Sequence, residues 1–267
     1  MVKHLISAAA SVNVGKYRAN NEDNLYFNGV FLTEQEREKP ASFHAECSDI
    51  RQLYAVCDGM GGEQYGELAS LLTVETVHHF ACAIKDDSKT NLNEQINHCI
   101  QTANELVCQA QREHSARRIG TTFALLATDG RTASIYNMGD SRIYLMRDGK
   151  ISQISEDHTY VASIAKIVGL TPAQEKAHPM RNRLTRYIGV NSTAEPVIAY
   201  MSSFKMKKRD TFLLCSDGLS DAVDDEEICR ILNESASPGE AAQRLMDAAL
   251  AEGKDNVTVI IASYNVI

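Results

Sequence analysis

The sequence predicts an α+β fold, arranged as one domain with an inserted flap. Short apolar runs typical of strands cluster together, and helical patterns cluster together, which disfavours a regular β-α-β alternation and a parallel sheet. Two Asp-Gly pairs, Asp129-Gly130 and Asp148-Gly149, each separate two apolar runs and indicate antiparallel hairpins. The 267 residues fit one large domain or two small ones, and one domain with a flap is the simpler description.

In the first half of the chain, three strands are expected before two helices. The strands are predicted at Ala8–Val14, Leu25–Leu32 and Leu53–Cys57. The polar stretch from Thr33 to Gln52 is rich in Glu and Lys and contains Pro40, so it is interpreted as a surface loop. Two helix faces follow from apolar residues at helical spacing: Leu68, Leu71, Leu72, Val74, Val77 and Phe80, then Ile96, Ile100, Ala103, Leu106, Val107 and Ala110.

The second half is predicted to return to strands and to end with two helices and a strand. The expected strands are Thr122–Thr128, Thr132–Met138, Arg142–Met146, Ile151–Ile154, Val197–Phe204, Thr211–Cys215 and Val257–Ser263. Helices are expected at Asp225–Asn233 and after Ser237, where Ser237-Pro238-Gly239-Glu240 predicts a capping box. Gly253 is expected to end the last helix.

The stretch from Asp157 to Pro196 differs from its surroundings and is interpreted as a flap. It is irregular, and Thr171-Pro172-Ala173-Gln174 predicts one short capped helix within it. Its basic residues stand out in an otherwise acidic chain: Lys166, Lys176, Arg181, Arg183 and Arg186.

Composition narrows the class of protein. The formal net charge of −8 argues against a dedicated nucleic-acid binder, which needs a basic face. Seven cysteines, an odd number with no C-x-x-C pair, disfavour a disulfide scaffold or a zinc finger and favour the cytoplasm. No apolar run approaches the ~20 residues that span a bilayer. The mildly apolar stretch from Leu5 to Val14 also imitates a weak signal peptide, but a first strand is the favoured interpretation.

Aspartates beside glycine at predicted strand ends are the main chemical signal. Any single Asp-Gly is more often a plain turn than a ligand, but several such motifs in one chain are less easily accidental. Carboxylate and backbone carbonyl oxygens are the ligands that Mg²⁺ and Mn²⁺ prefer. The chain has no P-loop, no H-E-x-x-H, no G-x-S-x-G, and no cysteine followed six residues later by arginine.

Taken in order, these motifs resemble the metal-dependent protein phosphatase family, the type 2C serine/threonine phosphatases, in its compact bacterial form. The resemblance covers nearly the whole chain. The matching residues are Arg18-x-x-Asn21-Glu22-Asp23, Asp58-Gly59-Met60-Gly61-Gly62, Gly120-Thr121-Thr122, Gly139-Asp140-Ser141-Arg142, Ser216-Asp217-Gly218 with Asp221, and Asp255-Asn256. The resemblance implies a central β-sandwich flanked by helical layers, with two Mg²⁺ or Mn²⁺ ions in a cleft at one end.

The resemblance also implies a role for each motif residue. Asp58 is expected to bridge two metals, with Asp217 and Asp255 completing the shell of one. The Gly59 carbonyl is expected to bind the other metal, and Glu22 to act on it through water. Residues expected to support these ligands are Asp23 and Asn256.

Two further roles come from the same resemblance. Arg18 is expected to grip the substrate phosphate, which suits its fork of donors. Asp140, with Asp217 or Asp221, matches the site of a third metal in bacterial members.

One position departs from part of the family. Some members carry a histidine where this chain has Met60, and that histidine can act as a general acid. A thioether cannot donate a proton, so another group or a metal-bound water must protonate the leaving oxygen. His158 and His178 lie in the flap region, and both are interpreted as structural because no partner motif accompanies them.

The sequence is therefore interpreted as a cytoplasmic protein-serine/threonine phosphatase, expected to be a monomer. A hydroxide bridging two metals would attack phosphorus directly, and the substrates would be phosphoproteins of a serine/threonine kinase. The flap would shape access for these substrates, or it would be a static cover with solvated charges. Two rivals are a non-catalytic phosphoprotein-binding module, which would lack metal carboxylates, and a simple cation-binding domain, which would not need Arg18.

Overall fold

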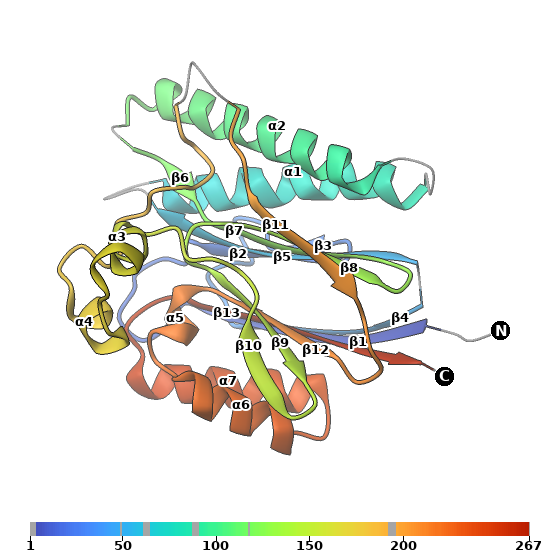
Figure 1. Ribbon diagram of the computed structural model, residues 1–267. Coiled ribbons are helices and arrows are strands. Elements are labelled where there is room, and N and C mark those ends of the chain that lie inside the picture. The colour runs from blue at the N-terminus through green and yellow to red at the C-terminus, as the bar shows by residue number, and fades with distance from the viewer. Residues whose placement is uncertain are drawn as a thin grey trace.

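Two antiparallel β-sheets pack face to face between two layers of helices (Figure 1). The computed structural model describes residues 4–48, 50–60, 65–86, 91–116, 118–191 and 196–266, apart from the side chains of residues 85, 86, 166 and 172. The predicted α+β class and the sandwich flanked by helices are confirmed. Gly61 and Gly62 of the second motif and the side chain of Lys166 lie outside the described part.

The first sheet has six strands and contains both ends of the described chain. Its order is β10 (Lys150–Gln153), β9 (Arg142–Arg147), β12 (Thr211–Cys215), β13 (Val257–Val266), β1 (His4–Asn13) and β4 (Ala41–Cys47). β1 and β13 pair over their whole length, from His4 opposite Val266 to Asn13 opposite Val257. The first and last strands of the described chain are therefore neighbours in the interior of this sheet.

The second sheet has seven strands. Its order is β11 (Tyr200–Lys205), β8 (Thr132–Met138), β7 (Phe123–Asp129), β5 (Arg51–Met60), β2 (Asp23–Phe27) and β3 (Val30–Phe31), and the short β6 (Gly120–Thr121) pairs with the end of β5. Both hairpins predicted from Asp-Gly pairs are present, as β7–β8 and β9–β10. Gly130, Asp148 and Gly149 have positive φ angles, the backbone conformation that such turns need.

Helices cover the outer face of each sheet. α1 (Gly66–Asp86) and α2 (Leu92–Glu113) lie on the seven-stranded sheet, while α6 (Asp225–Glu234) and α7 (Pro238–Glu252) lie on the six-stranded sheet, beside the short α5 (Asp217–Ser220) (Figure 1). Half of the capping box predicted for α7 is present, because Glu240 Oε2 accepts from the Ala236 N–H instead of the Ser237 N–H. The Ser237 side chain accepts a hydrogen bond from the Glu240 N–H, and Gly253 ends the helix in the left-handed conformation.

Buried apolar residues form three layers, one between the sheets and one under each helical layer. The central strands are therefore apolar on both faces, and alternate residues enter different layers. On β5, Tyr54 and Val56 face the layer between the sheets, whereas Leu53 and Cys57 face the helices. This alternation places the next residue, Asp58, at one end of the layer between the sheets.

Three sequence predictions need correction. The single strand predicted at Leu25–Leu32 is two antiparallel strands, β2 and β3, joined by a turn at Asn28 and Gly29. The predicted loop from Thr33 to Gln52 contains an edge strand, β4, which pairs with β1. Phe43 and Ala45 pack on the core, and the alternate residues of the strand are exposed. The polar exposed face of this edge strand made the segment look like a loop in the sequence. The predicted strand from Val197 begins only at Tyr200.

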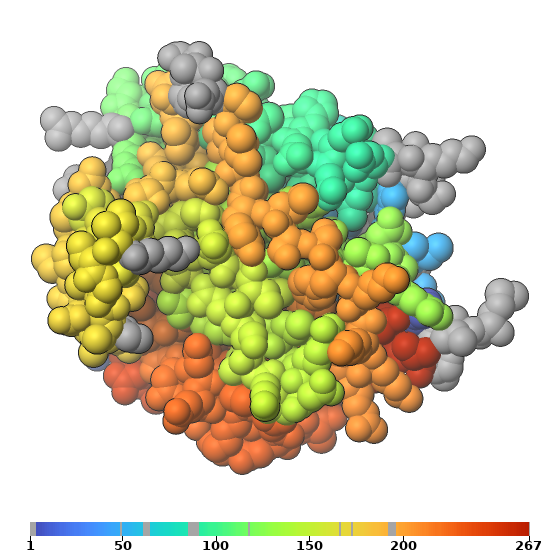
Figure 2. All heavy atoms as spheres, in the orientation of Figure 1, coloured from blue at the N-terminus to red at the C-terminus, as the bar shows by residue number. Residues whose placement is uncertain are grey.

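Between β10 and β11 the chain leaves the sheets and forms α3 (Tyr160–Val168) and α4 (Pro172–Ala177). α3 was not predicted, although Thr159 caps its start. The capping box predicted at Thr171 and Gln174 is present at the start of α4. This segment lies at the end of the sandwich that carries α5 and β6, opposite the two termini, and it protrudes at one edge of the molecule (Figures 1 and 2).

A buried ion pair provides a test of this packing. Arg147 donates to Asp210 through Nε at 2.8 Å and Nη2 at 2.6 Å, and Asp210 is 1% exposed. Arg147→Met should lower the free energy of unfolding by about 3 kcal/mol, because it leaves a buried carboxylate without its cation. Guanidinium denaturation measures this change. Arg230→Met is the control, since Arg230 forms its ion pairs on the exposed side of α6 and its loss should leave stability unchanged. Equal stability of both variants would contradict the prediction.

Candidate metal centre

At one end of the sandwich, the layer between the sheets changes from apolar to carboxylate side chains. Asp23 and Asp58 stand opposite each other in the β2–β5 ladder. Each is two residues from an apolar residue of the layer between the sheets, Leu25 on β2 and Val56 on β5. Residues two apart on a strand share a face, so both aspartates lie on the face that points into this layer. The strand ends therefore carry these two aspartates to the same rim.

The carboxyl groups at this rim act strongly on one another. Burial raises the pKa of Asp217 to about 6, and repulsion from Asp255 and Asp221 adds to the effect. Burial raises the pKa of Asp58 well above its usual range, and Asp23, Asp217, Asp140 and Asp255 raise it further by charge repulsion. So much negative charge in one recess is unfavourable unless cations neutralise it.

Asp140 and Asp221 extend the acidic cluster toward the protruding segment. Burial raises the pKa of Asp140, and repulsion from Asp217, Asp157 and Asp221 adds to the effect. Asp140 follows Gly139, whose φ of 96° favours glycine. The cluster thus joins residues from both sheets and from α5.

The donor chemistry fits a hard divalent cation. The side chains gathered here present carboxylate oxygens, the class of ligand that Mg²⁺ and Mn²⁺ prefer. Within the described residues, no three His, Cys, Asp or Glu side chains are close enough to hold an ion by themselves. Backbone carbonyls and water would have to supply further ligands, as is usual for Mg²⁺.

At Gly59, directly after Asp58, the backbone comes very close to two neighbouring segments. A Cβ atom there would lie 2.1 Å from the Gly66 carbonyl oxygen, at the start of α1, and 2.7 Å from the Glu22 carbonyl oxygen. Only glycine permits this close approach. The Gly59 N–H also donates to the Glu22 carbonyl at 3.1 Å, which ties the end of β5 to the Glu22 segment.

Arg18 lies at the exposed edge of the cluster. Its Nη2 donates to Asp255 Oδ2 at 2.7 Å, and its Nη1 lies 3.9 Å from Glu22 Oε2. The Arg18 side chain is 46% exposed, so the guanidinium stands beside the carboxylates and still faces solvent. A fork of N–H donors in this place suits an anion that approaches the cluster.

Asn256 holds the Arg18 segment in place. Its Oδ1 accepts from the Glu22 N–H at 2.8 Å, and its Nδ2 donates to the carbonyls of Val14 and Asn20 at 2.8 and 3.1 Å. Asn256 is 3% exposed and adjoins Asp255. One buried amide therefore fixes Glu22 relative to Asp255.

Asp23 ties the two sheets together behind the cluster. Its Oδ2 accepts from the hydroxyls of Ser216 and Thr258, each at 2.7 Å. Burial raises the pKa of Asp23 to about 7, although both hydrogen bonds favour the charged form. Ser216 precedes Asp217 directly, so this contact also positions the start of α5. The sequence included Ser216 in a motif, but it gave no sign that Thr258 would share the contact.

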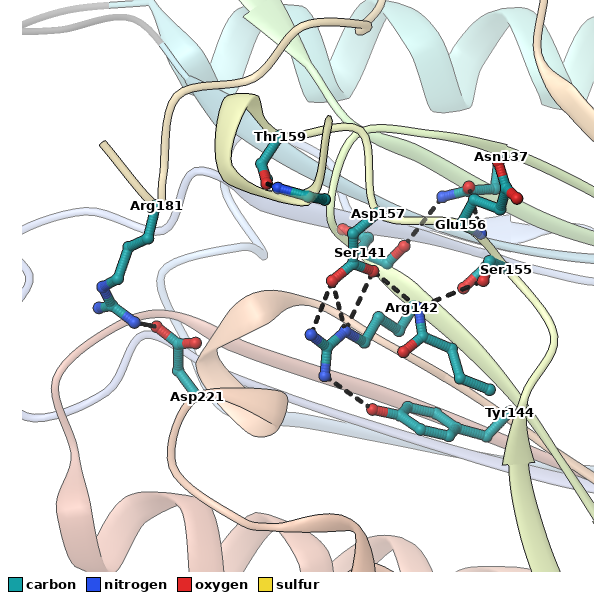
Figure 3. A network of polar contacts seen from close by, with 12 residues as sticks. Asn137, Ser141, Arg142, Tyr144, Ser155, Glu156, Asp157, Thr159, Arg181 and Asp221 are labelled. Atoms are coloured by element: carbon teal, nitrogen blue, oxygen red, sulfur yellow. Dashed lines mark hydrogen bonds and ion pairs between the residues drawn. The ribbon is translucent and has the colours of Figure 1, made fainter. Parts of the chain in front are cut away.

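The protruding segment contacts the cluster at Asp221. Arg181 Nη1 donates to Asp221 Oδ2 at 2.8 Å (Figure 3). Lys176 Nζ donates to the Asp221 carbonyl at 3.1 Å. Nearby, Arg142 forms a fork with Asp157, its Nη2 lying 2.7 Å from Oδ2. A cavity of about 910 Å³ lies between this segment and the body, and its lining includes Asp140 and Asp217.

The structure brings together at this end all ten residues that the sequence predicted for the site: Arg18, Glu22, Asp23, Asp58, Gly59, Asp140, Asp217, Asp221, Asp255 and Asn256. Met60 ends β5 here, opposite Gly120. His158 is buried, and burial followed by the charge of Arg186 lowers its pKa to about 4, so it is neutral. His178 Nδ1 accepts from the Met180 N–H at 3.1 Å, a local structural contact.

Comparisons with known proteins agree with this geometry. The family model "Protein phosphatase 2C" matches residues 41–253. The serine/threonine protein phosphatase PstP of Mycobacterium tuberculosis is 32% identical over 256 residues, which cover 95% of this chain and 44% of PstP. The chain thus spans less than half the length of that relative. Protein phosphatase PhpP of Streptococcus pneumoniae is 29% identical over 254 residues, which cover 95% of both chains.

Among solved structures, the catalytic domain of PstP in complex with two manganese ions superimposes with a TM-score of 0.79 at 30% identity. The superposition covers 98% of this chain and 99% of that one. None of the helices in the described ranges is long and apolar enough to cross a bilayer. Because the family model matches most of the chain and a relative above 30% identity covers nearly all of it, this chain belongs to the protein phosphatase 2C family.

Proposed function

We propose that this protein is a metal-dependent protein-serine/threonine phosphatase that hydrolyses phosphoserine and phosphothreonine. The observation that carries the proposal is the cluster of mutually repelling carboxylates with an exposed arginine 2.7 Å from one of them. Carboxylates can bind divalent cations, and the arginine can bind a phosphate through its N–H groups. The two kinds of group that phosphoryl transfer needs therefore lie next to each other. The names of the relatives PstP and PhpP support the same activity.

The ligand set proposed for two Mg²⁺ or Mn²⁺ ions is Asp58, Gly59, Asp217 and Asp255, with Glu22 acting through water. The PstP structure with two manganese ions supports this number. Divalent cations bound there would supply an activated water and would neutralise the phosphate. Asp140, with Asp217 or Asp221, is proposed as the place of a third ion.

The chain's own residues have separate tasks in this proposal. Arg18 binds and orients the phosphate from the solvent side, while Asn256 fixes its loop. Asp23 holds the two sheets at the correct separation through Ser216 and Thr258. The thioether of Met60 cannot protonate the leaving oxygen, so that proton must come from solvent or another group.

The alternatives fit less well. A non-catalytic phosphoprotein-binding module would not need Asp58, Asp217 and Asp255 together. A simple cation site would not need Arg18 at its exposed edge. A cysteine nucleophile at Cys57 is disfavoured, because the thiol is fully buried and burial raises its pKa well above the usual value.

The partners in this proposal are phosphorylated proteins, and the opposing enzyme is a serine/threonine kinase. We propose that the protein acts in the cytoplasm as a monomer. We also propose that the segment from residue 157 to 196 is a flap subdomain of one catalytic domain. Its contacts with Asp221 join it to the metal site.

The central test replaces a proposed ligand. Asp58→Asn and Asp217→Asn should each lower turnover of p-nitrophenyl phosphate and of a phosphothreonine peptide at least ~100-fold, since each removes a charged metal ligand. Chelator should abolish the activity of the parent protein, and Mn²⁺ should restore it.

Asp148→Asn is the matched control, because Asp148 also precedes a glycine but lies in the β9–β10 turn, where asparagine tolerates its φ of 52°. Calorimetric titration with Mn²⁺ should show weakened binding only in the site variants. Parent-like turnover of Asp58→Asn at saturating Mn²⁺ would refute the assignment.

Arg18 allows a second test. Arg18→Ala should reduce kcat/KM ~10- to 100-fold, the loss expected when charge-assisted hydrogen bonds of ~1.5–3 kcal/mol are removed. Mn²⁺ affinity should not fall, because Asp255 keeps its carboxylate. Arg18→Lys, which keeps the charge without the fork, should fall between the two. An unchanged kcat/KM for Arg18→Ala would show that the phosphate binds elsewhere.

The flap charges allow a third test. Combined Lys176→Gln, Arg181→Gln and Arg183→Gln should slow phosphopeptide hydrolysis by up to ~5-fold, the factor that 1 kcal/mol represents, and spare p-nitrophenyl phosphate. Arg183→Gln alone serves as the control, since Arg183 lies over the Tyr160 ring rather than on Asp221. Equal effects on both substrates, or on neither, would leave the flap as a static cover.

A further inference from the structure

Thr121 and Thr122 clamp the peptide groups of Asp58. The Asp58 N–H donates to Thr122 Oγ1 at 2.9 Å, and the Thr122 N–H donates back to the Asp58 carbonyl at 2.9 Å. Thr121 Oγ1 also donates to that carbonyl at 2.9 Å. Three hydrogen bonds therefore fix the backbone of one carboxylate-bearing residue to the segment between β6 and β7.

The same Thr122 hydroxyl also contacts the loop that carries Asp140. Thr122 Oγ1 and Ser141 Oγ lie 2.6 Å apart, and both residues are almost fully buried. A Cβ atom on Gly139 would lie 2.6 Å from Thr122 Cγ2, so this loop packs directly on the threonine. Thr122 lies between β6 and β7, and Ser141 lies in the loop that connects β8 of the seven-stranded sheet to β9 of the six-stranded sheet. The hydroxyl pair therefore joins the segment that holds Asp58 to the loop that carries Asp140.

The Asp140 loop is held on its other side as well. Asn137 Nδ2 donates to the Ser141 carbonyl at 3.1 Å, and Asn137 Oδ1 accepts from the Glu156 N–H at 3.1 Å (Figure 3). The His158 N–H donates to the Gly139 carbonyl at 2.9 Å. Ser141 thus connects the hydrogen-bonded Asp140 loop to Thr122, which holds the Asp58 backbone.

We propose that Thr122 and Ser141 are positioning residues, whose shared hydrogen bond sets the separation of Asp58 from Asp140 and thereby the affinity of the site for divalent cations. Neither hydroxyl is a proposed ligand, so each acts only through its neighbours. The inference rests on the proposed metal-dependent function. A carboxylate on a strand and one on a loop need such a link, because strand pairing alone does not fix the loop to the fraction of an ångström that coordination requires.

The competing explanation is that Thr122 contributes only to stability, as any buried hydrogen-bonded threonine does. The chain contains a matched control for this. Thr128 Oγ1 accepts from the Gln52 N–H at 3.2 Å, at the opposite end of the same β5–β7 pair. Thr128 is 1% exposed, so it is buried like Thr122, but it lies away from the acidic cluster.

The experiment compares Thr122→Val, Thr122→Ser and Thr128→Val in Mn²⁺ titration calorimetry and thermal denaturation. Both valine variants should lose thermal stability. Only Thr122→Val should bind Mn²⁺ more weakly, by ~10- to 100-fold, the loss typical of residues that orient metal ligands. Thr122→Ser keeps the hydroxyl and should restore Mn²⁺ affinity.

Ser141→Ala provides a second variant if Thr122→Val fails to fold, because it removes the shared hydrogen bond without altering the clamp on Asp58. It should also weaken Mn²⁺ binding. Parent-like Mn²⁺ affinity in folded Thr122→Val or Ser141→Ala would overturn the positioning role while leaving the proposed function standing. Absence of Mn²⁺ binding by the parent protein would instead refute the proposed function, and the positioning role with it.

Discussion

A β-sandwich has an apolar layer between its sheets, and that layer must end in polar groups wherever it meets water. In this protein one such end carries aspartates, because the strands that supply Leu25 and Val56 to the layer continue in register to Asp23 and Asp58. A carboxylate held this way is fixed by the whole sheet behind it. The location of the site is thus a consequence of how the sandwich ends, and the rest of the site is built around it.

Two buried polar contacts hold this end of the sandwich together. Asp23 accepts from Thr258 of the opposite sheet and from Ser216, which follows β12, and Thr122 meets Ser141 of the β8–β9 loop. Both contacts are enclosed, where an unpaired polar group is costly, so the first favours one separation of the sheets and the second favours one position of the Asp140 loop. Electrostatic repulsion among the carboxylates opposes this arrangement. Bound cations would reduce that repulsion, so cation binding would stabilise the folded arrangement of the carboxylates.

The segment that carries α3 and α4 stands apart from this rigid core. Its contacts with Asp221 come from Arg181 and Lys176, whose ion pair and hydrogen bond are solvent-exposed. Exposed ion pairs contribute little to stability, so these contacts can be exchanged at low cost. The body of the site and the segment beside it therefore differ in how firmly they are held.

The sequence alone determined the features that depend on local interactions. The hairpins at Asp129 and Asp148, the capped starts of α4 and α7, and the set of motif residues at strand ends could all be predicted, because turn and cap geometry is decided within a few residues. The tertiary structure decided what depends on distant partners. β4 could not be recognised as a strand without its partner β1. The hydroxyl of Thr258 contributes to the site only through its hydrogen bond to Asp23, which lies 235 residues earlier in the chain. The link between Thr122 and Ser141 likewise exists only because the β8–β9 loop folds back onto the start of β7, and such contacts leave no periodic or spacing signal in a single sequence.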